Sequence, residues 1–101
     1  MQVVITARHL TLTDSMKERI EAKTGKLLKF YNRVKQIEVI VEKHDTNCQM
    51  ECIVRAEPSI EIVAHSTAED FLTALDLLVD KLERQLSDHK ERFRNRKHPP
   101  E

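Results

Sequence analysis

Residues 34–65 have the sequence VKQIEVIVEKHDTNCQMECIVRAEPSIEIVAH, and this stretch decides the fold. Apolar and polar residues alternate along three runs within it, at 34–43, 48–57 and 60–65. Alternation with a period of two puts one set of side chains on a buried face and the other in water, which is typical of an antiparallel sheet covered on one side. The short polar segments 44–47 and 57–59 contain turn-forming residues and predict hairpin connections.

The segments before this stretch predict a strand and a helix. Residues 2–6 are apolar and β-branched, which favours a first strand. A helix is expected over residues 14–32, capped by Thr13 or Asp14, and its core-facing residues at helical spacing are Met16, Ile20, Leu27, Leu28 and Tyr31. Gly25, the only glycine, falls inside this helix, where it costs about 1 kcal/mol relative to alanine. Either close packing or the close approach of a ligand would explain it.

The segment after the three runs predicts a second, longer helix. Ser66 or Thr67 is expected to cap it, with Glu69 and Asp70 in its first turn. Apolar positions then follow each other three or four residues apart, and they are Phe71, Leu75, Leu78, Leu82, Leu86, His89 and Phe93. The first four turns can cover the sheet, whereas the end from about His89 is expected to project past it. The chain is therefore predicted to be one domain at 1–93 with a flexible basic tail at 94–101.

The predicted order of elements is β-α-β-β-β-α. It indicates an α+β two-layer sandwich, in which two helices pack on one face of a four-stranded sheet, similar to a double-stranded-RNA-binding fold with an extra first strand. Cys48 and Cys52 lie on one predicted strand, about 13 Å apart at roughly 3.3 Å per residue. A disulfide needs Cα atoms within about 7 Å, so both cysteines are expected to be small buried core residues.

Catalytic and metal-binding motifs are not recognised in the sequence. One glycine cannot build a phosphate-cradling loop, and no Ser-His-Asp set is evident. Asp76 and Asp80 lie four apart beside Lys81 and Arg84, which favours a salt-bridged helix edge over a catalytic dyad. We expect no enzyme, no cofactor and no functional metal site. Because no apolar run reaches the roughly 18–20 residues of a membrane helix and no signal peptide is recognised, the expected location is the cytoplasm.

The charges sum to zero but are segregated along the chain. Residues 15–33 contain six basic and two acidic residues, and residues 81–98 contain seven basic and three acidic ones. Residues 34–70, by contrast, contain three basic and eight acidic residues. Basic helices beside acidic strands indicate a surface that binds a polyanion. Such helix faces are often merely solvated, and the concentration of the carboxylates in the strands is what favours binding.

The basic residues of the two helices are expected to form one positive ridge. Arg19, Lys23, Lys26 and Arg33 share one side of the first helix, with Lys29 at its edge. On the second helix, basic residues flank both sides of the apolar stripe: Lys81, Arg84 and Arg92 on one side, and Lys90, Arg94 and Lys97 on the other. Since few aromatic residues accompany them, structured RNA recognised by its backbone and shape fits better than single strands.

Residues 68–90, AEDFLTALDLLVDKLERQLSDHK, closely resemble the second helix of ribosome hibernation promoting factors and of the related ribosome-associated inhibitor A. The segment DKLERQL at 80–86 is the most specific piece. The opening MQVVIT and the first helix, through Ala22-Lys23 and Lys26-Leu27 to Arg33, agree with it. The resemblance extends to about Phe93. Two positions depart from the family: Asp88 stands where a lysine is frequent, and Glu57-Pro58-Ser59 replaces a glycine-rich hairpin.

The resemblance implies a domain that occupies the decoding region of the small ribosomal subunit and excludes messenger RNA and transfer RNA from the A and P sites. The positions that match the family's RNA-contacting residues are Lys23, Lys26, Arg33, Lys81, Arg84 and Lys90. Arg19, Lys29, Arg92 and Arg94 are added from helix geometry alone. The short tail favours the short promoting type, which acts with a separate ribosome modulation factor to form paired ribosomes and is expected to be monomeric when free.

Two other functions compete with this expectation. The first is a factor similar to ribosome-associated inhibitor A, which inactivates single ribosomes without promoting their pairing. The second belongs to a different class: a protein-interaction module whose strand face would dock a basic partner through Glu38, Glu42, Glu51 and Glu61.

Overall fold

The computed structural model describes the backbone of residues 2–29 and 31–97, with side chains as far as Lys90. The three alternating runs form β2 (Val34–His44), β3 (Asn47–Ala56) and β4 (Ile60–Ala68), which pair antiparallel. The β2–β3 hairpin closes at Asp45 and Thr46, and Asp45 has a φ of 55°, in the left-handed region that aspartate tolerates better than most residues. Both predicted hairpins are confirmed.

The first strand, β1 (Gln2–Arg8), pairs parallel with β2, from Gln2 opposite Gln36 to Arg8 opposite Glu42. It is two residues longer than predicted, and β4 extends three residues beyond its predicted end. The sheet order is β1-β2-β3-β4. Because parallel neighbours need a crossover connection, the chain runs through α1 (Asp14–Gly25) before it enters β2.

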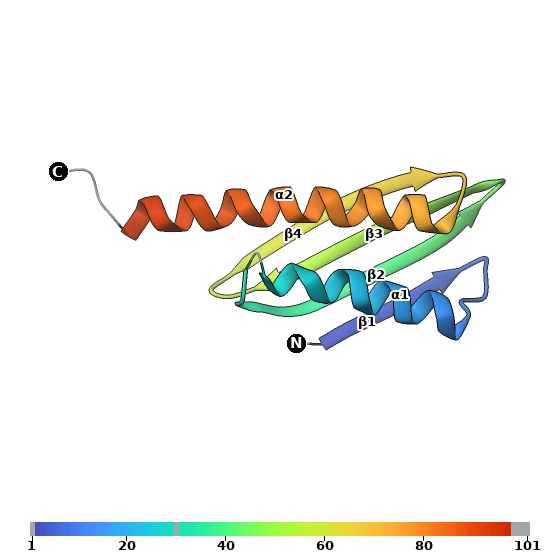
Figure 1. The fold of residues 1–101 in the computed structure, drawn as a ribbon, viewed down its shortest axis with the longest axis horizontal. Helices are drawn as coiled ribbons and strands as arrows, with labels where there is room; N and C mark the ends of the chain where they lie inside the picture. The colour runs from blue at the N-terminus through green and yellow to red at the C-terminus, as the bar shows by residue number, and fades with distance from the viewer. Residues whose placement is uncertain (1, 30, 98–101) are drawn as a thin grey trace.

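Both helices lie on one face of the sheet (Figure 1), as the sequence predicts. Inward-facing strand residues such as Ile37, Val39 and Val54 are fully buried there, against Ile20 of α1 and Leu78 of α2 (Phe71–Lys97). The last turns of α2 extend beyond the sheet, as expected (Figure 1). The predicted tail at 94–101 overlaps this helix, since α2 continues to Lys97.

The first helix is shorter than predicted. Thr13 is its N-cap, with the side-chain oxygen accepting from the Met16 N–H at 3.1 Å, so this part of the prediction is confirmed. The α-helix ends at Gly25 and continues as a 3-10 turn, η1 (Lys26–Lys29), so the expectation of one helix over 14–32 is wrong. The buried Thr24 hydroxyl donates to the Ile20 carbonyl at 2.7 Å, a local bond of the kind that weakens a helix.

The second helix begins later than predicted. Neither Ser66 nor Thr67 caps it, because both still belong to β4. Asp70 takes this role: its carboxylate accepts from the Thr73 N–H and from the Thr73 hydroxyl, each at 2.8 Å. Asp70 therefore precedes the first turn instead of lying in it. Ser66 is buried and donates to the Ala74 carbonyl at 2.7 Å, which ties the end of β4 to α2.

The cysteines behave as the sequence predicts. Cys48 and Cys52 are both buried and unpaired on the inward face of β3. Burial, followed by the nearby carboxylates of Glu38 and Glu51, raises the pKa of Cys52 to about 12. No helix in the described part of the chain is long and apolar enough to cross a membrane.

Candidate nucleic-acid interface

The basic residues of α1 and η1 lie on their solvent side. Arg19, Lys26 and Lys29 are exposed, and Lys23 is partly covered. Arg33 is exposed too, but it lies beyond η1 in the turn that precedes β2, so the expectation that it shares a side of the first helix is wrong. The 3-10 turn changes the geometry that was predicted from an uninterrupted α-helix. A 3-10 helix has three residues per turn, so Lys26 and Lys29, at its two ends, lie on one side of it. Lys29 therefore aligns with Lys26 and does not sit at the edge of the row.

Two basic residues of α2 lie toward the other flank, beside the edge strand β4. The Lys81 ammonium donates to the His65 carbonyl, and one turn later the Gln85 amide donates to the Val63 carbonyl at 3.3 Å. Both acceptors belong to β4, which has only one neighbouring strand. Lys81 is thus anchored along this edge by its tip, and Arg84 lies nearby with 78% of its side chain exposed.

Between the two sets of cations lies a row of carboxylates, Asp76, Asp80 and Glu83, which we call the acidic row. Together with Lys23, Lys26 and Val79 it lines a shallow cleft of about 150 Å³. Lys23 Nζ lies 3.1 Å from Asp76 Oδ1, which joins α1 to α2, and Arg84 pairs with Asp80 at 3.2 Å within α2. The single positive ridge expected from the sequence is therefore divided: the acidic row separates the cations of α1 and η1 from Lys81 and Arg84.

The remaining predicted residues lie further along α2. Lys90 is exposed. Arg92 and Arg94 belong to the helical segment, but their side chains lie outside the described ones. Sequence reasoning recognised the Asp76/Asp80 spacing as a salt-bridged edge, and the Arg84–Asp80 pair confirms that part. It missed that Asp76 faces Lys23 of another helix, and it missed Gln85 as a contact of β4.

The described side chains offer this surface little other chemistry. No group of three or more histidine, cysteine, aspartate or glutamate side chains among them could hold a metal ion. Exposed ion pairs such as Lys23–Asp76 contribute at most about 1 kcal/mol to folding, so these cations can exchange their partners for phosphates at small cost. What the surface offers is fixed positive charge on the solvent side of two helices.

Comparison with known proteins identifies a family and relatives similar to this chain. Residues 3–94 match the family described as Sigma 54 modulation protein / S30EA ribosomal protein. The ribosome hibernation promoting factor of Azotobacter vinelandii is 35% identical over 92 residues, which cover 91% of this chain and 85% of that protein. The protein of the same name from Escherichia coli K12 is 30% identical over 94 residues, 93% of this chain and 98% of its relative.

Two solved structures share the fold. A ribosomal subunit interface protein from Coxiella burnetii superposes with a TM-score of 0.84 at 24% identity, covering 90% of this chain and 99% of that one. The N-terminal domain of Thermus thermophilus Protein Y gives 0.79 at 21% identity, with 88% and 99% covered. With a family match over nearly the whole chain and relatives at 30–35% identity, the chain belongs to the Sigma 54 modulation protein / S30EA ribosomal protein family, which includes the ribosome hibernation promoting factors.

Proposed function

We propose that this protein binds the small ribosomal subunit through the exposed cations of its helical face and holds ribosomes inactive. The observation that carries the proposal is the placement of these cations. Arg19, Lys26 and Lys29 of α1 and η1, and Lys81, Arg84 and Lys90 of α2, lie on the solvent side of elements that share one face of the sheet, and Arg33 is exposed in the turn that follows η1. Membership in a family with hibernation promoting factors supports ribosomal RNA as the polyanion.

The proposed mechanism is occupancy. The domain fills the decoding region, where it excludes messenger RNA and the transfer RNAs of the A and P sites, so that initiation cannot proceed. No bond is made or broken, and the protein needs no cofactor. The acidic row divides the cations, so ribosomal RNA phosphates should contact two separate basic tracks, one on α1 and η1 and the other along the β4 side of α2. Recognition through phosphates predicts a steep dependence on salt.

We assign the protein to the short promoting type, which forms paired ribosomes together with a modulation factor. The names of its relatives from Azotobacter vinelandii and Escherichia coli support this choice. The other candidate is a factor that inactivates single ribosomes and leaves them unpaired. Adding the modulation factor to ribosomes loaded with the protein separates the two: paired particles on a sucrose gradient support the first, and only single ribosomes support the second.

Sedimentation with ribosomes at low and high salt tests the binding proposal. The protein should migrate with the small subunit and the intact ribosome at low salt and leave them at high salt. Lys81→Glu with Arg84→Glu should weaken binding at least 100-fold, because two phosphate contacts become two repulsions. Lys35→Glu with Lys43→Glu makes the same change of charge on β2 and should change affinity less than fivefold.

Lys81 also donates to β4, so the single variant Arg84→Glu serves as a version that keeps the strand edge intact, with thermal melting as the check on folding. If the unmodified protein stayed at the top of the gradient at low salt, ribosome binding would be refuted. If both double variants lost binding equally, net charge and not the helical face would be responsible.

A further inference from the structure

No helix or strand of the described residues covers the face of the sheet opposite α1 and α2, and we call it the outer face (Figure 1). It carries residues from all four strands, because every second position of each strand points outward. Its ionisable side chains are Glu38, Glu42, Glu51, Glu61, Arg8, Arg55, His44 and His65. Four carboxylates face two guanidinium groups and two imidazoles, so the outer face is acidic where the helical face is basic.

One half of the outer face is partly neutralised by a cation of the protein itself. The Arg55 guanidinium lies 3.3 Å from a carboxylate oxygen of Glu38 and 3.4 Å from one of Glu61, and it also donates to the Gln36 side chain at 2.8 Å. These residues come from β2, β3 and β4, which lie side by side. The guanidinium is shared between the two carboxylates, so both already pair with a cation of the protein.

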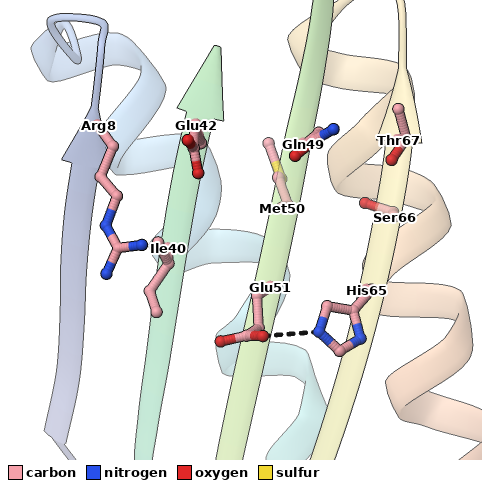
Figure 2. A pocket seen from close by; sticks show the side chains of 9 residues that line it. All are labelled: Arg8, Ile40, Glu42, Gln49, Met50, Glu51, His65, Ser66 and Thr67. Carbon is pink, nitrogen blue, oxygen red and sulfur yellow. Dashed lines mark hydrogen bonds and ion pairs between the residues drawn. The ribbon is translucent and has the colours of Figure 1, made fainter. Parts of the chain in front are cut away.

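In the other half, the carboxylates lie beside imidazoles instead of a guanidinium group. Glu51 has one partner, the imidazole of His65 at 2.6 Å, and the side chain of His65 is 67% exposed. Among the described side chains, the basic group within 4.0 Å of the Glu42 carboxylate is the imidazole of His9. Figure 2 shows the guanidinium of Arg8 level with Ile40, away from the Glu42 carboxylate. Glu42 and Glu51 therefore border a shallow depression of about 320 Å³ without a strong cationic partner.

The spacing of these two carboxylates selects the shape of a ligand. Glu42 lies opposite Gln49, so Glu51 is its diagonal neighbour on β3, at a typical separation of about 7–8 Å. In an extended chain, side chains two residues apart lie on one side at roughly 6.6 Å. Ile40, beside the depression, offers aliphatic surface to the stem of a long basic side chain.

We propose that the outer face binds an extended cationic polypeptide segment, whose basic residues at alternate positions pair with Glu42 and Glu51 in this depression. The four carboxylates of the face would repel RNA phosphates, and no phenylalanine, tyrosine or tryptophan side chain lines the depression for base stacking. The site is independent of the proposed ribosomal RNA contacts, because it lies on the opposite face of the sheet. Arg8 borders the same depression and competes with the cationic ligand.

Fluorescence anisotropy with a labelled nonapeptide of alternating arginine and threonine tests this proposal on the full chain at low salt. Glu42→Gln with Glu51→Gln should weaken binding about tenfold, the effect of losing two exposed ion pairs. Arg8→Ala should strengthen binding about threefold. Asp76→Asn with Glu83→Gln removes the same charge from the helical face and should change the affinity less than twofold. Thermal melting verifies that each variant folds.

Two controls decide whether the spacing matters and which polymer binds. A peptide of the same composition with contiguous arginines should bind at least threefold more weakly, and equal affinity would overturn the proposal. So would an unchanged affinity of the Glu42→Gln, Glu51→Gln variant. In NMR spectra of the labelled protein, the peptide should shift amides around Glu42 and Glu51. Shifts there on adding a structured RNA oligonucleotide, but none on adding the peptide, would assign the face to RNA instead.

Discussion

Gly25 is the last residue of α1, and a Cβ atom built on it would meet nothing within 4 Å. Its φ is not positive. Close packing within the domain therefore does not explain the glycine. Gly25→Ala should raise the free energy of unfolding by about 0.5–1 kcal/mol, because alanine favours the helix and restricts the unfolded chain. Urea denaturation measures this, and a loss of stability would contradict it.

The second explanation of Gly25 is the close approach of a ligand. If an RNA backbone passes over the junction of α1 and η1, Gly25→Ala should weaken ribosome binding while it stabilises the protein. Ala22→Gly is the matched control, an exposed position in the same helix, where the opposite change should cost stability and leave ribosome binding intact. Unchanged binding by Gly25→Ala would exclude a close contact at this position.

Cys52 should be chemically inert in the folded protein. With its pKa raised to about 12 by burial and by Glu38 and Glu51, roughly one molecule in ten thousand carries the thiolate at pH 8. Iodoacetamide should therefore label Cys52 at least 100-fold more slowly in the native protein than in urea, as measured by mass spectrometry. Rapid labelling without denaturant would indicate that β3 opens locally.

At the scale of elements, Asp70 controls the start of α2. Its bonds from the Thr73 N–H and then the Thr73 hydroxyl hold its pKa below the usual range. The unfolded chain, with an ordinary pKa near 4, thus takes up the proton first. The stabilisation is complete above that value and is lost as the pH falls through the folded pKa. Asp70→Asn keeps a good cap, so it should melt like the unmodified protein at pH 7.

The check on this prediction is the difference between the two melting temperatures as the pH is lowered. The unmodified protein should lose stability faster than Asp70→Asn between about pH 4.5 and the folded pKa, since other carboxylates titrate alike in both proteins. Parallel curves over the whole range would mean that the Asp70 charge contributes nothing to the start of α2.

Strands were easier to predict from this sequence than helix ends. Alternation in residues 34–65 defined three strands, because a half-buried sheet imposes it on every residue. The start of α2 was missed because Ser66, a good capping residue by type, points into the core and bonds to Ala74. The end of α1 was missed because the switch to a 3-10 turn at Lys26 leaves an apolar pattern, at Leu27 and Leu28, that still fits an α-helix.

At the scale of the whole molecule, the acidic row should limit affinity for RNA. Asp76→Asn with Glu83→Gln should raise the affinity for ribosomes about threefold, because phosphates would meet less repulsion and Lys23 would be released from Asp76. Glu38→Gln with Glu61→Gln changes the net charge equally on the outer face and should alter ribosome affinity less than twofold. Equal gains in both variants would show that only net charge matters.

The candidate site was predictable in composition but not in arrangement. Helical spacing predicts which side of its helix each cation occupies, and the exposure of residues such as Arg19 and Lys90 agrees with that. The position of one helix relative to its neighbour is set by packing across the sheet, which no local pattern contains. The Lys23–Asp76 contact and the anchoring of Lys81 on β4 are both of this kind.

Lys81 and Gln85 have one more consequence, which concerns association between copies. Their bonds to the carbonyls of His65 and Val63 occupy acceptors that a further strand would need at β4. Among the described strands, β1 is then the edge at which a further strand can pair. A protein with two such edges can add copies without limit, whereas a protein with one can pair with a single other copy only. Association through strand edges in a concentrated solution should therefore terminate at pairs and never propagate into fibres.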